Sequence, residues 1–283
     1  MSKRSIGKSG SSKASCSSGT CSGDNCSCTI NKCAEGVIGQ YSHLEGIGNA
    51  ASGYASHAEG FYTKACNYST HSEGYRTLAG GTHSHAEGYL TSARGNESHS
   101  EGNNTKACGK SSHSEGANTI AEGNYSHAEG ACTSARGEKS HSEGGTTSAL
   151  GDYSHSEGYK TYAHGVASHT EGSETEARGD YSHTEGYGGI AYGLGSHVEG
   201  QGTDDIAVLI DSIIPGKSVL DARVGILANI AQGTASHAEG SATQATGNYS
   251  HAEGVATRAT GVASHAEGLC TQAIGIASHA EGD

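Results

Sequence analysis

Residues 126–139 read SHAEGACTSARGEK, and this stretch contains the pattern that decides the fold. The unit S-H-A-E-G-x-x-T-x-A-x-G-x-x recurs with a period of fourteen residues, and every copy places Glu two residues after His and Gly directly after Glu. The sixteen histidines of the series are His43, His57, His71, His85, His99, His113, His127, His141, His155, His169, His183, His197, His237, His251, His265 and His279. A fixed period of this length identifies a repeat protein.

The glycines of the unit argue against a helical repeat and favour a β-solenoid. Glycine in a helix interior costs about 1 kcal/mol relative to alanine, so a glycine-rich unit makes a poor helix. Fourteen residues suit one solenoid turn of two short strands and two tight corners. The corner glycines include Gly60, Gly74 and Gly88 at the first corner and Gly53, Gly81 and Gly95 at the second. Asn67 replaces glycine at one second corner and is expected to adopt the same left-handed geometry.

Strand alternation assigns each position to a face, because successive side chains of a strand point to opposite sides. In the first strand, His and Glu share one face, and a small residue such as Ala58 or Ser72 takes the other. In the second strand, Thr63 and Ala65 share a face. The residues that alternate with them vary: Lys64, Leu78, Ser92, Ile120, Tyr162 and Glu176. We expect Ala, Ser and Thr to fill a thin interior and the variable positions to face solvent.

The His-Glu face therefore points away from its own roll, yet it is as constant between copies as the interior. An interior of Ala and Thr buries little area at about 25 cal/mol per Å², so a single roll is marginally stable. We expect this face to pack against further copies of the chain. The residues expected along the shared axis are His57, Glu59, His71, Glu73, His85, Glu87, His99, Glu101, His113, Glu115, His127, Glu129, His141, Glu143, His155, Glu157, His251, Glu253, His265 and Glu267.

Composition excludes several classes of protein. The chain has 283 residues with no Trp, one Phe and one Met, too few bulky apolar groups for a thick core. A formal net charge of −13 without a basic stripe argues against nucleic-acid binding. Residues 1–18 are basic but carry no apolar segment typical of a secretion signal, and no run approaches a membrane span.

The unit resembles the head repeat of YadA-like trimeric adhesins, also called the Hep_Hag repeat, which is written roughly S-V-A-I-G-x-x-S/T-x-A-x-G-x-x. The Gly, Thr/Ser and Ala positions coincide over residues 37–200 and 229–283. The resemblance implies an all-β fold, a left-handed parallel β-roll of fourteen-residue turns. It also implies a parallel homotrimer whose first strands face the threefold axis.

The His-Glu pair replaces the apolar pair of that family, and the S-H-A-E-G version is similar to repeats in phage tail and Gram-positive surface proteins. The coiled-coil stalk and membrane anchor of secreted adhesins are not found, and the repeat series runs to Asp283. We therefore expect a non-enzymatic structural fibre or surface-attachment protein on a virus particle or a spore. Sixteen rungs at about 4.8 Å each predict a rod of roughly 80 Å.

The His-Glu ladder allows more than one chemistry. The simplest hypothesis is a polar interface without a cofactor, in which imidazole donates to carboxylate. A second is metal binding, since histidines converging on a threefold axis bind Zn or Ni, even if only adventitiously. Ser56, His57 and Glu59 are also the residue types of a hydrolytic triad, but neighbouring Ser and His should point to opposite faces, which argues against an enzyme. The sign of any shift in the histidine pKa stays open, because burial lowers it and a nearby Glu raises it.

Tyrosines near one corner suggest a receptor- or glycan-binding module as an alternative function. These residues are Tyr41, Tyr54, Tyr68, Tyr125, Tyr153, Tyr181 and Tyr249. The competing interpretation is that they pack at the corner.

Two segments do not follow the repeat. Residues 1–36 form an arm rich in Cys, Ser and Gly, in which Cys16, Cys21, Cys26, Cys28 and Cys33 favour interchain disulfides and higher assembly, reduced thiols or zinc. Residues 201–228 form an apolar insertion that widens the His197–His237 interval to forty residues. We expect this insertion to be a β-hairpin or a strand exchanged between chains.

Overall fold

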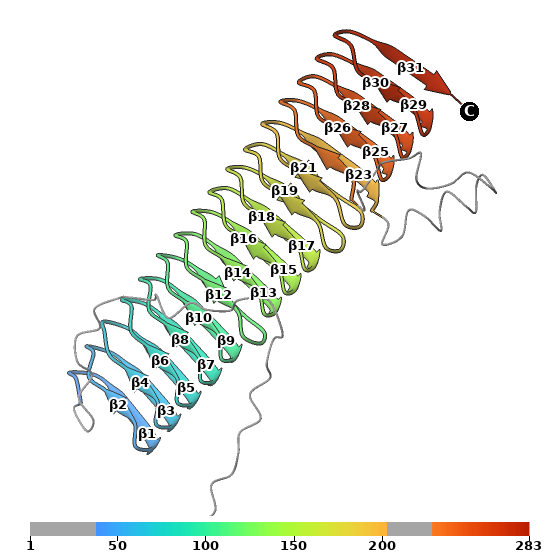
Figure 1. The fold of residues 1–283 in the computed structure, drawn as a ribbon. Coiled ribbons are helices and arrows are strands. Elements are labelled where there is room, and N and C mark those ends of the chain that lie inside the picture. The colour runs from blue at the N-terminus through green and yellow to red at the C-terminus, as the bar shows by residue number, and fades with distance from the viewer. Residues whose placement is uncertain (1–37, 203–227, 283) are drawn as a thin grey trace, which may run out of the picture.

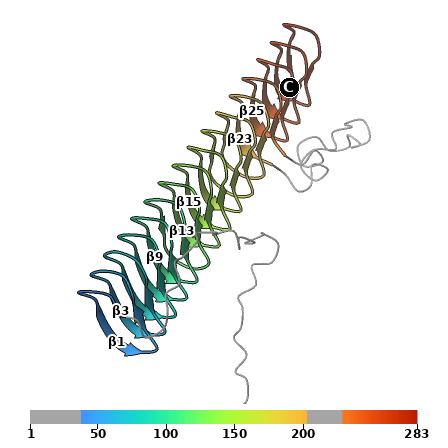
Figure 2. The ribbon, with the colours of Figure 1, turned by 90° about the vertical axis from the view of Figure 1, so that its left-hand side faces the viewer.

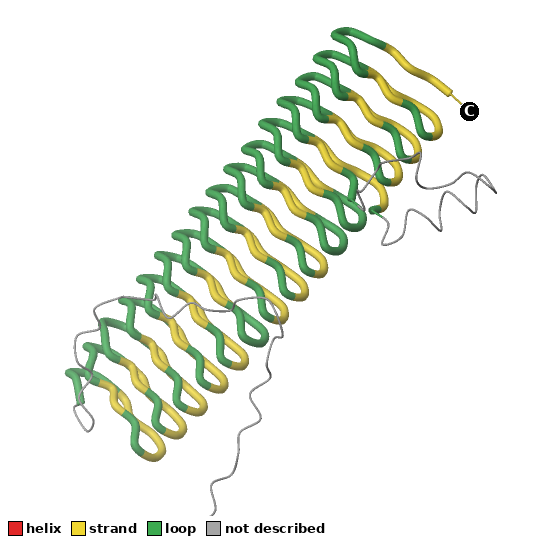
Figure 3. Tube along the Cα trace, viewed as in Figure 1, coloured by secondary structure: helices red, strands yellow, loops and turns green. Residues whose placement is uncertain are grey.

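A computed structural model describes residues 38–202 and 228–282, and these residues form a parallel β-solenoid of about fifteen turns without a helix. The turns stack into an elongated rod (Figures 1 and 2). Each turn contributes two strands, joined by loops at the corners (Figure 3). The strand that begins at the ladder histidine is called the longer strand, although in three turns it too has only two residues, and the other is the shorter strand. The predicted all-β solenoid is confirmed, and the fourteen-residue period matches the spacing of its turns.

The longer strands form a sheet of sixteen that carries the His-Glu face. They are β1 (His43–Ile47), β3 (His57–Phe61), β5 (His71–Tyr75), β7 (His85–Tyr89), β9 (His99–Asn103), β11 (His113–Ser114), β13 (His127–Ala131), β15 (His141–Gly145), β17 (His155–Tyr159), β19 (His169–Thr170), β21 (His183–Thr184), β23 (His197–Gln201), β25 (His237–Ser241), β27 (His251–Val255), β29 (His265–Leu269) and β31 (His279–Gly282).

The shorter strands form a sheet of fifteen on the other side of each turn. They are β2 (Ala50–Ala51), β4 (Lys64–Ala65), β6 (Leu78–Ala79), β8 (Ser92–Ala93), β10 (Lys106–Ala107), β12 (Ile120–Ala121), β14 (Ser134–Ala135), β16 (Ser148–Ala149), β18 (Tyr162–Ala163), β20 (Glu176–Ala177), β22 (Ile190–Ala191), β24 (Ile230–Ala231), β26 (Gln244–Ala245), β28 (Arg258–Ala259) and β30 (Gln272–Ala273).

Pairing joins equivalent residues of successive turns, so each sequence position becomes a column along the rod. His127 lies beside His141, and Glu129 lies beside Glu143. The columns continue across the insertion, because His197 of β23 pairs with His237 of β25. Residues 203–227, which hold most of the predicted insertion, and the arm with its cysteines lie outside the described residues.

Small residues fill the interior, as the alternation predicted. Ala58 of the first strand and Thr63 and Ala65 of the second are fully buried. Ser56, just before the first strand, is also buried, and its hydroxyl donates to the Gly53 carbonyl oxygen over 2.8 Å. The same serine bond recurs in other turns and satisfies a carbonyl at the second corner.

The corner glycines serve two different purposes. Gly60 has a φ of +112° and requires glycine conformationally. Gly53 keeps a negative φ, but a Cβ there would lie 1.7 Å from the Asn67 carbonyl oxygen of the next turn. The expectation of left-handed geometry at Asn67 is therefore wrong: the left-handed residue of that corner is Ser69, with a φ of +49°.

The variable positions of the second strand point outward, but not all of them reach solvent. Lys64 and Leu78 are partly exposed, whereas Ser92 and Ile120 are 7% exposed, so the solvent-facing prediction is wrong for the latter two. In-register pairing places each side chain between those of the neighbouring turns, and these cover the shorter or apolar groups.

Candidate functional site

The ladder histidines form one continuous column of stacked imidazoles along the rod. Each imidazole comes from the first residue of a longer strand, and in-register pairing fixes the ring separation. Ring centroids of His113 and His127 lie 4.8 Å apart, with the planes 7° from parallel. The column crosses the insertion without a break, since His197 and His237 stack at 4.7 Å. At the N-terminal end, the pair His43 and His57 departs from this pattern with a tilt of 54°.

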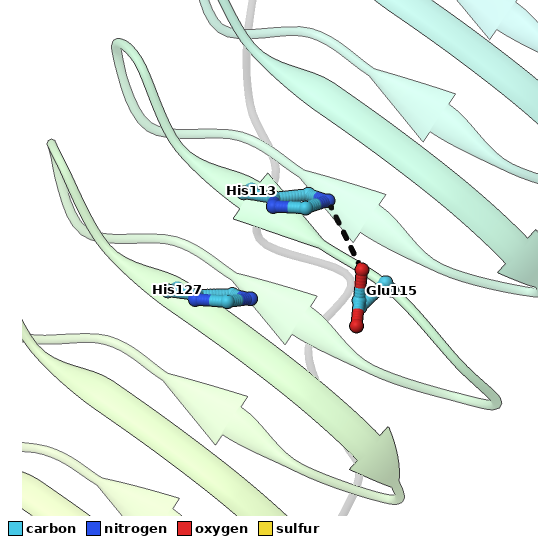
Figure 4. A group of neighbouring side chains, drawn as sticks. All are labelled: His113, Glu115 and His127. Carbon is cyan, nitrogen blue, oxygen red and sulfur yellow. Dashed lines mark ion pairs between the residues drawn. The ribbon is translucent and has the colours of Figure 1, made fainter.

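A glutamate column runs beside the imidazoles, because His and Glu lie two residues apart on one strand face. His113 Nε2 lies 3.5 Å from Glu115 Oε2, and the Glu115 carboxylate faces the edges of the His113 and His127 rings (Figure 4). The corresponding distance reaches 4.0 Å between His169 and Glu171. These separations suit an electrostatic pair but exceed a normal N–H···O hydrogen bond.

The Nε2 atoms are covered, although the rings are not. The side chains of His71 and His85 are 38% and 34% exposed. Their Nε2 atoms are nevertheless buried and have no hydrogen-bond partner among the described residues. Fourteen ladder histidines share this state: His57, His71, His85, His99, His113, His127, His141, His155, His169, His183, His197, His237, His251 and His265. A buried polar atom without a partner is costly, so the repetition calls for a physical explanation.

Burial lowers the pKa of several ladder histidines. Desolvation lowers the pKa of His85, and its neighbours His71 and His99 add to the effect. The same primary cause lowers the pKa of His113, His127, His155, His169, His197 and His237. Stacking therefore resolves the sign that the sequence left open: burial outweighs the attraction of the carboxylates.

The carboxylates show the opposite shift. Desolvation raises the pKa of Glu87, and the like charges of Glu73 and Glu101 raise it further. A hydrogen bond with Glu171, followed by burial and a hydrogen bond with Glu199, raises the pKa of Glu185 to about 7. Both sets of shifts favour the uncharged side chain, because burial penalises charge in the imidazole column and in the carboxyl column alike.

The structure brings the predicted ladder residues together in a way that sequence reasoning did not foresee. We expected clusters about a threefold axis; within one chain, a His, the Glu two residues later and the His of the next turn already form a group. The groups include His113–Glu115–His127, His127–Glu129–His141, His155–Glu157–His169, His197–Glu199–His237 and His237–Glu239–His251. The donor atoms of each group lie within 4.8 Å of one another. The fourteen-residue period already implied these groups, because it places equivalent histidines on neighbouring strands of the same sheet.

The structure does not assemble the triad considered at the outset. Ser56 is buried and donates to a carbonyl oxygen, whereas His57 lies on the outer face. The two side chains therefore point to opposite sides of the strand.

Aromatic side chains gather at the corners near the N-terminal end of the described rod. Tyr54 and Tyr68 are 43% and 48% exposed and stack at 5.2 Å. Phe61, Tyr75 and Tyr89 form a second stack at the other corner, with separations of 5.5 and 5.0 Å, which sequence analysis missed. The remaining tyrosines of the predicted set are also exposed, and they are Tyr41, Tyr125, Tyr153, Tyr181 and Tyr249.

Comparison with protein-family models found no matching family, and a search of curated proteins found no match. Within the part of the chain that the structure describes, no helix has the length and apolarity needed to cross a membrane.

Proposed function

We propose that this chain is a non-enzymatic structural rod that joins copies of itself along the His-Glu face. The supporting observation is that this outward face repeats without change, while other outward positions vary from turn to turn. A solvent-exposed face needs no such constancy, whereas an interface built from stacked rungs does. The YadA-like resemblance supports a left-handed β-roll, a parallel homotrimer and a place on a virus particle or spore surface.

The thin interior supports self-association on energetic grounds. Its buried side chains are almost all Ala, Ser and Thr, and Val198 is the largest of them. At about 25 cal/mol per Å², such residues contribute little burial per turn, and each turn contacts only its neighbours. Covering the half-exposed imidazoles of His113 and its equivalents would add burial at each rung.

Sixteen equivalent rungs also fit a scaffold better than an enzyme. Catalysis requires one site tuned in geometry and pKa. Here His113, His127 and His155 have the same surroundings and the same direction of pKa shift. The repetition gives a uniform surface, which suits assembly.

The proposal is tested by measuring molecular mass in solution. Sedimentation equilibrium of the purified full chain should give three times the 28.5 kDa chain mass. Replacing Glu101, Glu115 and Glu129 with Lys should dissociate the trimer, because longer cationic side chains that cannot accept a hydrogen bond would replace the carboxylates beside the imidazoles of each affected rung. Charge reversal of Lys64, Lys106 and Arg258 on the opposite sheet is the matched control and should leave the mass unchanged. A folded wild-type monomer at micromolar concentration would overturn the proposal.

The attachment surface needs a separate test. Immunogold labelling should place the chain on intact virus particles or spores, and labelling of the host cell interior alone would count against this location.

A receptor- or glycan-binding role is the second candidate, favoured by the exposed aromatic stacks. Stacked rings with cations nearby, such as Arg76 at 5.4 Å from the Tyr75 ring centroid, are surfaces on which sugar rings pack. Binding on a glycan array that is lost in Tyr54→Ala/Tyr68→Ala would support this role. An array without hits would favour the pure scaffold.

A further inference from the structure

We propose that adjacent rungs of one chain bind divalent transition-metal ions between a histidine, the glutamate two residues later and the histidine fourteen residues on. The best defined example is His113, Glu115 and His127 (Figure 4). The site lies within a single chain and does not depend on self-association.

The first argument is the distance between the donor atoms. Metal–nitrogen bonds of about 2.0–2.1 Å and metal–oxygen bonds of about 2.0–2.2 Å at a tetrahedral angle separate N and O by about 3.4 Å. His113 Nε2 and Glu115 Oε2 are 3.5 Å apart, as are the corresponding atoms of His155 and Glu157. This distance is too long for a good hydrogen bond and right for two ligands of one ion. The third donor, on His127, lies within 4.8 Å of the other two, and a tilt of its ring would bring it to the ion.

The second argument is the unsatisfied nitrogen. Nε2 of His113 and of His127 is buried without a hydrogen-bond partner among the described residues. A bound ion would satisfy the lone pair that each neutral imidazole directs toward the glutamate column.

The third argument is electrostatic. The carboxyl group of Glu115 lies between those of Glu101 and Glu129, the equivalent residues of the two neighbouring turns. A divalent cation placed between the imidazole and carboxylate columns would compensate this row of like charges. The donor set of imidazole and carboxylate suits Zn²⁺, Co²⁺, Ni²⁺ and Cu²⁺.

The geometry also fixes a stoichiometry. Because one Nε2 binds one ion, the two groups that share His127 exclude each other, and occupied sites must alternate along the ladder. Sixteen histidines taken in pairs allow at most eight ions per chain. Threefold clusters, with one ion per rung of a trimer, would instead take about five ions per chain.

The test uses two variants with the same number of substitutions. In the alternating variant, Gln replaces every second ladder histidine: His57, His85, His113, His141, His169, His197, His251 and His279. In the block variant, Gln replaces the first eight: His43, His57, His71, His85, His99, His113, His127 and His141. Both keep eight ladder histidines and every glutamate, but only the block variant keeps adjacent pairs.

Zn²⁺ bound to chelator-treated full chain is measured by elemental analysis after dialysis, with Co²⁺ absorption as a spectroscopic readout. We expect up to eight ions in the wild type, up to four in the block variant and nearly none in the alternating variant. A His83→Gln/His164→Gln control, outside the ladder, should bind as the wild type does.

Equal binding by the two variants would overturn the proposal, because threefold clusters do not need adjacent rungs within a chain. Circular dichroism verifies that each variant folds. If a variant does not fold, the number of ions bound by the wild type distinguishes sites within one chain from threefold clusters. Sedimentation of the same samples reports self-association independently, so the failure of either proposal is recognised separately.

Discussion

Val198 occupies the space that a side chain on Gly189 would need. A Cβ on Gly189 would lie 2.7 Å from Val198 Cγ1 and 3.1 Å from Thr184 Cγ2. In most other turns the position of Gly189 holds threonine, and the position of Val198 holds a smaller residue such as Ala128 or Ser142. The interior therefore conserves volume: the one buried valine is matched by a glycine on the opposite strand.

This compensation predicts strong coupling between the two positions. Gly189→Thr should lower the free energy of unfolding by roughly 1–3 kcal/mol, because it overfills the turn. Val198→Ala alone should also destabilise, by about 1–2 kcal/mol, because it leaves a void. The double variant should recover most of the loss, and a double-mutant cycle in thermal or urea unfolding measures this coupling. Additive effects would show that the two side chains do not share a space.

Buried threonine hydroxyls give a second prediction. Ser142 Oγ lies 2.8 Å from Thr147 Oγ1 in the interior. Where alanine replaces that serine, as at Ala128, the buried Thr133 hydroxyl has no hydrogen-bond partner within the described ranges. Ala128→Ser should raise the free energy of unfolding by about 1 kcal/mol, and Ser142→Ala should lower it by a similar amount. A higher melting temperature for Ala128→Ser and a lower one for Ser142→Ala would confirm that the serine hydroxyl stabilises the turn as the partner of the buried threonine. A lower melting temperature for both variants would contradict this.

The second-corner glycines give a third prediction with an internal control. A Cβ on Gly261 would lie 2.0 Å from the Gly275 carbonyl oxygen, whereas a Cβ on Gly275 would meet only ordinary contacts at 3.6 Å, in the last described turn. Gly261→Ala should therefore lower the melting temperature markedly, and Gly275→Ala should leave it nearly unchanged. Equal effects would mean that glycine acts here through chain entropy and not through the close approach of turns.

The sequence was sufficient for the solenoid, its corners and its interior, because the period and strand alternation determine them directly. It was not sufficient where the outcome depends on neighbouring turns. The coverage of Ile120 and the close approach of Gly53 to Asn67 arise from contacts between equivalent residues of neighbouring turns, and the exchange between Gly189 and Val198 arises from a contact across the interior. The groups of two histidines and one glutamate were missed for the same reason, since the expected axis lay between chains.

The direction of the histidine shifts predicts acid destabilisation. A histidine whose pKa is lowered by folding takes up its proton less readily than in the unfolded chain. Stability is therefore full above the unfolded value of about 6.5 and falls as the pH drops through the folded pKa. Groups such as His85, with His71, His99, Glu73 and Glu101 around it, drive this loss.

Raised carboxyl pKa values act in the opposite sense. Glu185, with a pKa of about 7, adds stability in acid that is lost as the pH rises from about 4.5 to 7. Lowered histidines outnumber raised ladder glutamates, so we expect a lower melting temperature at about pH 5 than at about pH 8. Replacing His85, His113 and His127 with Gln should weaken this pH dependence, whereas His83→Gln, outside the ladder, should not. A melting temperature that rises on acidification would show that the glutamate column, not the stacked imidazoles, governs the ladder.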